Sequence, residues 1–489
     1  MKKKPAFRLL FMVSAMILAG NACVASAQAD PGKPNIILVM SDDQGFVDVG
    51  YNTNNDLGIQ TPHLDQMARE GLLFNRFYAT PNCSPTRASV LTGRHPFRTG
   101  VFNPGWAMNT GELTVARVLA EAGYSTAHFG KWHLGSVDAD SPYNPHKRGF
   151  EYYLSNDQHF NLNPTLSLNG VKDRYDGEGS EVIVQGAINY IDQLKDSNKP
   201  FFILIWYGSP HGGFEAVPED AALYADLTTK DVSEFGKIDL ELLKGYFAEI
   251  TAMDRSIGIL RKALKDRNID QNTLVLFNSD NGNGKFEQLD DLRGGKGSIW
   301  DGGLRVPAIA VWPEVIRQPV ETDAYVATWD IMHTLMDIAG VKVTNHVMDG
   351  VSFYPLLQGK KMEREQPLCY WFYRRGVTDK ILMEYKPGTP KRGESKHLDN
   401  PEVIPEKDPG WTTIIDGKWK YHHNPPSNEG SHELYNIRTD PGETNNVASE
   451  HPEVVRSLDE KLTAWRNSVK QSLRGEDYEV TPQIITVHK

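Results

Sequence analysis

Two pairs of oxygen-bearing residues stand directly after runs of apolar residues. Asp42 and Asp43 follow the first run, and Asp280 and Asn281 follow a later one. Adjacent carboxylates repel each other unless a cation holds them, and Ca²⁺ prefers carboxylate and amide oxygens. An isolated Asp-Asp pair is more often a solvated turn. The matching placement of the two pairs favours a calcium site.

The segment NCSPTRASVLTGR, residues 82–94, places a cysteine at the start of an expected helix. Pro85 suits a first helical turn and Gly93 suits a helix end. A helix N-terminus favours an anion, and Arg87 lies one turn beyond Cys83, where it could point back. These features predict an anionic group held on or beside position 83.

Cysteine use does not by itself decide the role of that thiol. The chain has three cysteines, Cys23, Cys83 and Cys369. A single Cys83–Cys369 disulfide and two buried thiols are both open alternatives, since free cysteine is commonly buried.

Basic and imidazole side chains also follow apolar runs. Lys131 and His133 come after the run 125–129, and His211 comes after the run 200–207. A lone Lys or His is more often a surface group. Their shared position after a predicted strand makes a role in acid–base chemistry the stronger interpretation.

The apolar runs predict buried strands that alternate with amphipathic helices. This alternation indicates an α/β fold with a mostly parallel, mixed sheet between helices, in which ligands collect beyond the carboxyl ends of the strands. The predicted strands are 35–40, 125–129, 200–207, 273–278 and 306–312, and the predicted helices are 63–70, 83–92, 113–122, 180–194 and 239–265.

The composition changes after Gly359, where polar, Pro-rich and Lys-rich segments appear. Segments 411–422 and 433–437 resemble antiparallel strands, and 454–471 resembles a closing helix. We therefore predict a large domain over residues 28–360 and a smaller α+β domain with an antiparallel sheet over 361–489.

The N-terminus predicts export. Residues 1–27 combine a basic start, a short apolar run and a small-residue cleavage pattern, as in a secretory signal peptide. A lipid anchor on Cys23 is the weaker alternative, because the residues before it match a lipoprotein box poorly. No later run is long enough to cross a bilayer, and the net charge of −11 argues against nucleic acid as a partner.

Five segments together resemble the type I, formylglycine-dependent sulfatases of the alkaline phosphatase-like superfamily. In this family a cysteine within such a motif is converted to Cα-formylglycine by a maturation enzyme, which reads residues like Ser84 to Arg87. The segments are CSPTR with LTGR (83–87 and 91–94), GKWHLG (130–135), SDNG (279–282), GKG with GGLRVP (295–307) and HELYN with DPGE (432–443).

The resemblance implies a calcium-dependent covalent mechanism in the larger domain. One hydroxyl of the hydrated aldehyde attacks sulfur with help from the metal and Arg87, and the second expels sulfate. A serine could form the first ester but could not release it in this way. The implied metal ligands are Asp42, Asp43, Asp280, Asn281 and the modified Cys83.

Four further residues match family positions. His133 matches the base for the second step, and Lys131 and Lys296 match lysines that hold sulfate oxygens. His211 matches a histidine near the leaving oxygen, a candidate general acid.

The resemblance leaves the substrate open between sulfated carbohydrates and small aryl sulfates, and we expect a periplasmic or secreted carbohydrate sulfatase. Phosphate or phosphonate ester hydrolysis is an alternative, although the oxygen-rich ligand set favours Ca²⁺ over zinc. A catalytically silent carbohydrate-binding protein would keep Cys83 unmodified. Candidate pocket residues are Trp106, His159, Trp206, Arg374 and Arg375, with core packing as the alternative for both tryptophans.

Overall fold

The computed structural model describes residues 32–52, 57–373, 410–425 and 430–487. The predicted signal peptide and the candidate pocket residues Arg374 and Arg375 lie outside these ranges. No helix among the described residues is both long and apolar enough to cross a membrane.

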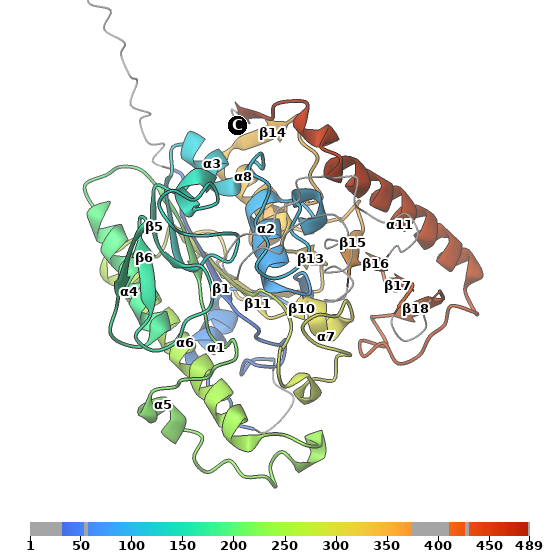
Figure 1. The fold of residues 1–489 in the computed structure, drawn as a ribbon, viewed down its shortest axis with the longest axis horizontal. Coiled ribbons are helices and arrows are strands. Elements are labelled where there is room, and N and C mark those ends of the chain that lie inside the picture. Colours follow the sequence, from blue (N-terminus) through green and yellow to red (C-terminus); the bar gives the residue numbers. More distant parts are fainter. Residues whose placement is uncertain (1–31, 53–56, 374–409, 426–429, 488–489) are drawn as a thin grey trace, which may run out of the picture.

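A mixed sheet of ten strands forms the centre of the molecule (Figure 1), in the order β12-β2-β11-β9-β1-β8-β4-β5-β6-β7. Strands β9, β1, β8, β4 and β5 are parallel neighbours, as predicted, and β11 runs antiparallel to β9. The strands are β1 (Asn35–Ser41), β2 (Leu72–Phe74), β4 (Ser125–Lys131), β5 (Tyr152–Asn156), β6 (Thr165–Leu168), β7 (Val171–Arg174), β8 (Phe201–Trp206), β9 (Thr273–Ser279), β11 (Ala308–Val311) and β12 (Val320–Thr322).

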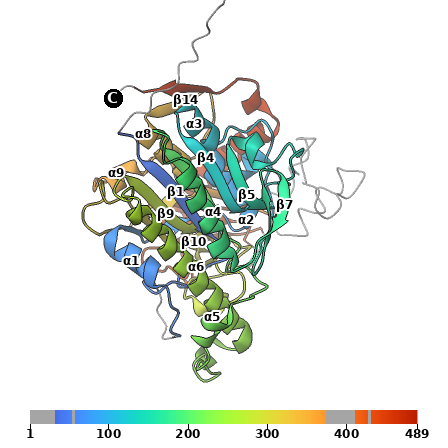
Figure 2. The same ribbon diagram turned by 90° about the vertical axis from the view of Figure 1, so that its left-hand side faces the viewer.

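Helices cover both faces of this sheet, and each face has its own apolar core. One core joins the sheet to α1, α4 and α6, which Figure 2 shows in front of the strands; the other joins it to α2, α3, α8 and α9. The helices are α1 (Pro62–Glu70), α2 (Cys83–Thr92), α3 (Val115–Glu121), α4 (Gly179–Gln193), α5 (Pro218–Ala222), α6 (Leu240–Asp266), α7 (Asp301–Leu304), α8 (Asp330–Ala339), α9 (Tyr354–Leu357) and α11 (Pro452–Leu473).

The predicted strand 306–312 is wrong as a single element. The chain forms β10 (Arg305–Val306) and then β11, and the two belong to different sheets. Pro307 separates them, since it has no backbone N–H for a ladder. Strand β10 joins a three-stranded sheet with β3 (Phe77–Tyr78) and β13 (Val326–Ala327).

A separate antiparallel sheet of four strands, β15-β16-β17-β18, forms the C-terminal part, and α11 packs on it. The predicted segment 411–422 is a hairpin rather than one strand, because Gly417 turns the chain in the left-handed region with φ of 61°. The strands are β15 (Leu368–Phe372), β16 (Trp411–Asp416), β17 (Trp419–His423) and β18 (His432–Asn436).

One strand pair crosses the predicted domain boundary at residue 360. Strand β19 (Gln483–Thr486), near the C-terminus, pairs antiparallel with β14 (Val341–Thr344). The boundary itself stays a prediction.

Candidate active site

The carboxyl ends of neighbouring parallel strands deliver the chemical groups to one edge of the sheet. Asp42 follows β1, Asp280 follows β9, and Lys131 is the last residue of β4. Backbone N–H groups then join these ends: Asp42 N donates to the carbonyl of Ser209 after β8, and Asp280 N donates to that of Ser41. The parallel register therefore brings together segments that are far apart in the sequence.

Four potential metal ligands converge at this edge. Ligand atoms of Asp42, Asp43, Cys83 and Asp280 lie within 4.8 Å of one another, and all four residues are buried. Burial and the nearby Asp42 carboxylate raise the pKa of Asp280 to about 7. The cluster therefore concentrates like charges that a cation would stabilise.

Asn281 completes this oxygen cluster. Its side chain is fully buried, and its Nδ2 donates to Asp43 Oδ1 at 2.9 Å. Its Oδ1 has no hydrogen-bond partner among the described residues. A buried acceptor without a donor is costly, and a Ca²⁺ ion held by these oxygens would satisfy it.

Three cationic side chains surround the carboxylates: Lys131, Lys296 and Arg87. Lys131 forms an ion pair with Asp42, and Lys296 Nζ lies 2.5 and 2.7 Å from the two oxygens of Asp43. Burial opposes ionisation of Asp42, but Lys131 and the other nearby cations outweigh it and hold the pKa of Asp42 well below its usual value.

Arg87 links the cluster to the helix that carries Cys83. Its Nη2 lies 2.9 Å from Asp280 Oδ2 and 3.5 Å from Asp42 Oδ2, and its Nη1 donates to the carbonyl of Lys131 at 3.0 Å. The guanidinium also lies over the Trp206 ring, 5.1 Å from its centroid. Arg87 is thus fixed in place, fully buried, beside two carboxylates.

Cys83 is the first residue of α2, and its Sγ lies 3.4 Å from Asp42 Oδ1 and 3.8 Å from Asp43 Oδ1. Burial and the neighbouring Asp280 and Asp42 raise the pKa of the thiol well above its usual value. The thiol is therefore protonated at neutral pH, and a protonated thiol is a weak nucleophile. A reactive cysteine would need the opposite environment.

The disulfide alternative is wrong. Cys83 and Cys369 are both free and buried. Their sulfur atoms are not joined, as in the alternative of two buried thiols.

Ser84 and Thr86 fix the start of α2 in a way that the sequence did not reveal. Ser84 Oγ donates to the carbonyl of His133 at 2.6 Å and accepts from the N–H of Gly105 at 2.9 Å. Thr86 Oγ1 donates to the carbonyl of Asp280 at 2.5 Å. These two hydroxyls tie the helix to two of the strand ends, so they have a structural function in addition to any role in recognition.

His133 places a buried imidazole beside the charged cluster. Its Nδ1 is buried and has no hydrogen-bond partner in the described part of the chain, and its backbone is left-handed with φ of 57°. Burial and the neighbouring Lys131 hold its pKa well below its usual value. A neutral imidazole with an available lone pair can accept a proton.

His211 lies on the more open side of the cluster. Its Nε2 is 3.7 Å from Asp43 Oδ2, and its side chain is 26% exposed. The ring stacks on that of His159, with centroids 4.3 Å apart. Burial lowers the pKa of His211, although Asp42 acts in the opposite direction. The two imidazoles therefore mark the side from which solvent reaches the site.

Trp106 and Trp206 do not line a pocket. They are 2% and 0% exposed and belong to the apolar core between the sheet and α2. The suggestion that these rings stack on a sugar is wrong, and the core-packing alternative is confirmed, since neither ring has an open face.

Glu249, on α6, is a supporting residue that sequence reasoning missed. Its Oε2 accepts from Ser209 Oγ at 2.5 Å, and its Oε1 accepts from the N–H of Glu215 at 2.9 Å. It therefore anchors the segment that leads into His211. The sequence does contain a hint of this role, because Glu249 is a charged residue in a mostly apolar stretch of the helix.

Comparison with known proteins identifies the family. The Sulfatase family model matches residues 34–341. The chain is 31% identical over 355 residues to an ulvan-active sulfatase of Formosa agariphila, covering 69% of this chain and 68% of the relative. It is 30% identical over 486 residues to human arylsulfatase A, covering 89% and 88% of the two chains.

Solved structures share the architecture. The crystal structure of Ps i-CgsB in complex with k-i-k-neocarrahexaose aligns with a TM-score of 0.73 at 25% identity, over 92% of this chain and all of the other. A phosphonate monoester hydrolase of Agrobacterium radiobacter aligns with a TM-score of 0.63 at 20% identity, over 89% and 96% of the two chains, which shows a common fold alone. The extent of the family match, together with the relatives, identifies this chain as a member of the sulfatase family, an enzyme that hydrolyses sulfate esters.

Proposed function

We propose that this sulfatase is exported and removes sulfate from a carbohydrate, using Ca²⁺ and a formylglycine formed from Cys83. The proposal is based mainly on the position of Cys83, which lies among buried carboxylate oxygens. A thiol held protonated among carboxylates is unsuited to thiol chemistry. The same position is well suited to an oxygen side chain beside a cation.

The calcium ion would be held by oxygens of Asp42, Asp43, Asp280 and Asn281, together with the modified residue 83. Two observations support this set: Asn281 Oδ1 has no hydrogen-bond partner in the described part of the chain, and three carboxylates approach one another closely. The bound ion would supply positive charge that stabilises anionic groups at the reaction centre.

The hydrated aldehyde at position 83 would supply a hydroxyl that attacks sulfur and a second that permits release of sulfate. Arg87 would orient this residue, because its guanidinium is fixed by Asp280 and by the carbonyl of Lys131. It would also favour the anionic form of a hydroxyl near it, through its charge.

Lys131 and Lys296 would bind the sulfate oxygens. Each ammonium group now pairs with a carboxylate, Lys131 with Asp42 and Lys296 with Asp43. They come from different parts of the chain, since Lys131 ends β4 and Lys296 lies in the loop before α7. Two ammonium groups in this arrangement can share the charge of a sulfate group.

Two histidines would divide the proton transfers. His133 is buried and neutral, and it would accept a proton during release of sulfate. His211 is partly exposed, and it would donate a proton to the oxygen of the departing alcohol. A sugar alkoxide is a poor leaving group, so this donation matters most for carbohydrate substrates.

The carbohydrate substrate rests on the relatives and on the predicted route. Named relatives act on ulvan and on N-acetylgalactosamine 6-sulfate groups, and one similar structure holds a neocarrahexaose. The basic start and apolar run of residues 1–27 support export to a place where polysaccharides occur.

Two measurements test the proposal. Intact-mass analysis of protein from a host with the maturation enzyme should show residue 83 about 18 Da lighter than cysteine, or near parity when hydrated. A screen of sulfated oligosaccharides, 4-nitrophenyl sulfate and matched phosphate esters should show fastest release of sulfate from an oligosaccharide. Unmodified Cys83 without activity would support the silent carbohydrate-binding protein, whereas faster phosphate release would overturn the substrate assignment.

A further inference from the structure

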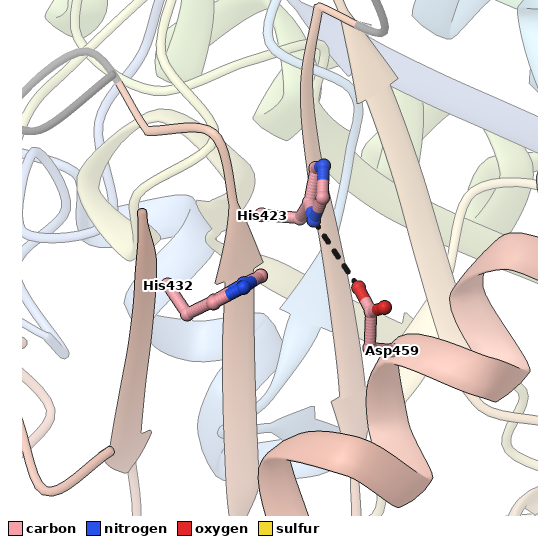
Figure 3. A group of neighbouring side chains, drawn as sticks. All are labelled: His423, His432 and Asp459. Carbon is pink, nitrogen blue, oxygen red and sulfur yellow. Dashed lines mark hydrogen bonds and ion pairs between the residues drawn. The ribbon is translucent and has the colours of Figure 1, made fainter. Parts of the chain in front are cut away.

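A second group of metal-binding side chains lies on the C-terminal sheet. His423 ends β17 and His432 begins β18, and the two are direct partners across the antiparallel pair. Asp459 reaches them from α11, and ligand atoms of the three residues lie within 4.8 Å of one another. Figure 3 shows the three side chains pointing toward a common centre from these three elements.

The register explains why these residues meet. Directly opposite residues in an antiparallel pair project to the same face of the sheet, and residues two apart on one strand share that face. Tyr421 and His423 therefore face α11, whereas His422 faces the other way and bonds to Glu443 at 2.7 Å. Adjacent histidines thus have separate environments, and only His423 belongs to the cluster.

Tyr421 organises the cluster through two hydrogen bonds. Its hydroxyl lies 2.8 Å from Asp459 Oδ1 and 2.5 Å from His432 Nδ1. A phenol has one hydrogen, which it donates to the carboxylate, so the Nδ1–H of His432 donates to the phenol oxygen. The other ring nitrogen of His432, Nε2, then keeps its lone pair. A metal-binding histidine usually has its second nitrogen held in this way.

We propose that His423, His432 and Asp459 form a zinc site, separate from the oxygen cluster at Cys83. Two imidazole nitrogens and one carboxylate oxygen, with a position left for water, are a typical zinc ligand set. His423 Nδ1 lies 3.1 Å from Asp459 Oδ1. This is close to the roughly 3.3 Å between two ligands of a tetrahedral ion with bonds of about 2.0 Å. Calcium is disfavoured, because it prefers oxygen ligands.

The charges around the cluster act in two directions. Arg466, two turns after Asp459 on α11, adds positive charge that opposes a bound cation. The Asp459 carboxylate, next to His423, supplies negative charge that favours one. A bound zinc ion would join β17, β18 and α11.

The test is calorimetric titration of the full enzyme with zinc chloride in saturating Ca²⁺, so that calcium fills the oxygen cluster. The wild type should bind one zinc ion per chain at this site. His432→Gln should weaken binding at least about tenfold, because it removes an exposed ligand without disturbing the core. His451→Gln, at the start of α11, is the matched control and should bind zinc like the wild type.

Thermal unfolding gives a second readout that does not depend on activity. Zinc should raise the Tm of the wild type by at least about 2 °C and leave that of His432→Gln unchanged. No zinc binding by the wild type, or equal affinity in His432→Gln, would overturn the site. Either result is independent of whether Cys83 is modified or which ester is hydrolysed.

Discussion

The oxygen cluster around Cys83 and the histidine cluster around His423 are both suited to a metal, but they are built differently. The first combines four carboxylate or amide side chains, all buried, with three cationic residues. The second combines two imidazoles and one carboxylate, with His432 exposed to solvent. Ligand chemistry and burial thus predict a hard cation at one site and a borderline one at the other.

The difference follows from the two sheets. At the edge of a parallel sheet, strands from distant segments end side by side, so their ends gather many groups in a buried place. An antiparallel pair instead joins residues that are close in the sequence, as with His423 and His432. It offers fewer ligands and leaves them nearer to solvent.

The largest expected effect comes from Cys83→Ser. Turnover should fall at least about 10⁴-fold, as for loss of a nucleophile, because serine lacks the second hydroxyl that releases sulfate. Mass spectrometry after incubation with substrate should reveal one trapped sulfate ester or none. Full multiple turnover in this variant would show that the aldehyde is not needed.

Asp280→Ala tests whether the two clusters are independent. It should remove Ca²⁺ and lower kcat/KM at least about 10³-fold, since a bound ion supplies several kcal/mol of charge stabilisation. Asp459→Asn should have the opposite effect: its calcium content should be normal and its zinc binding weakened. Metal analysis of both variants checks this, and unchanged calcium in Asp280→Ala would contradict the ligand assignment.

His211→Gln should have a smaller effect that depends on the leaving group. Loss of a general acid should slow a sugar sulfate about 10²-fold and 4-nitrophenyl sulfate less than about tenfold, because nitrophenolate leaves without a proton. His451→Gln is the control and should retain wild-type rates on both. Equal losses on the two substrates would mean that His211 binds sulfate rather than donating a proton.

The smallest effect concerns Glu249, which anchors the segment before His211. Burial raises the pKa of Glu249 from 4.5 to about 7. Between these two pH values the carboxyl group is protonated in the folded protein and ionised in the unfolded chain. Stability should therefore fall as the pH rises from 4.5 to 7. At pH 8, Glu249→Gln should avoid up to about 3 kcal/mol of this decrease in the free energy of unfolding. At pH 4.5 the variant and the wild type should have similar free energies of unfolding.

Urea unfolding of both proteins at pH 4.5 and pH 8 measures the difference. The wild type contains other buried carboxyls with raised pKa, such as Asp254, so the comparison uses the change between variant and wild type. A variant with the same pH dependence as the wild type would show that Glu249 is ionised in the folded state.

Much of the fold could be predicted because buried strands and amphipathic helices leave periodic patterns. Strands β1, β4, β8 and β9 and helix α6 lie close to their predicted ranges. The prediction of a single strand at 306–312 was wrong because the residues before and after Pro307 pair with strands of different sheets. That choice is made by tertiary contacts, which the local pattern does not contain.

The sequence alone determined which groups could do chemistry and which strand ends carry them. Asp42, Asp43, Asp280 and Asn281 were identified by type and by position, and the sulfatase motif by its order of residues. Only the tertiary structure decided the environment of each group. It buries Trp206, raises the pKa of the Cys83 thiol, and leaves Asn281 Oδ1 without a hydrogen-bond partner among the described residues. Burial and charge at a site depend on residues from distant parts of the chain, and these meet only when the sheet is assembled.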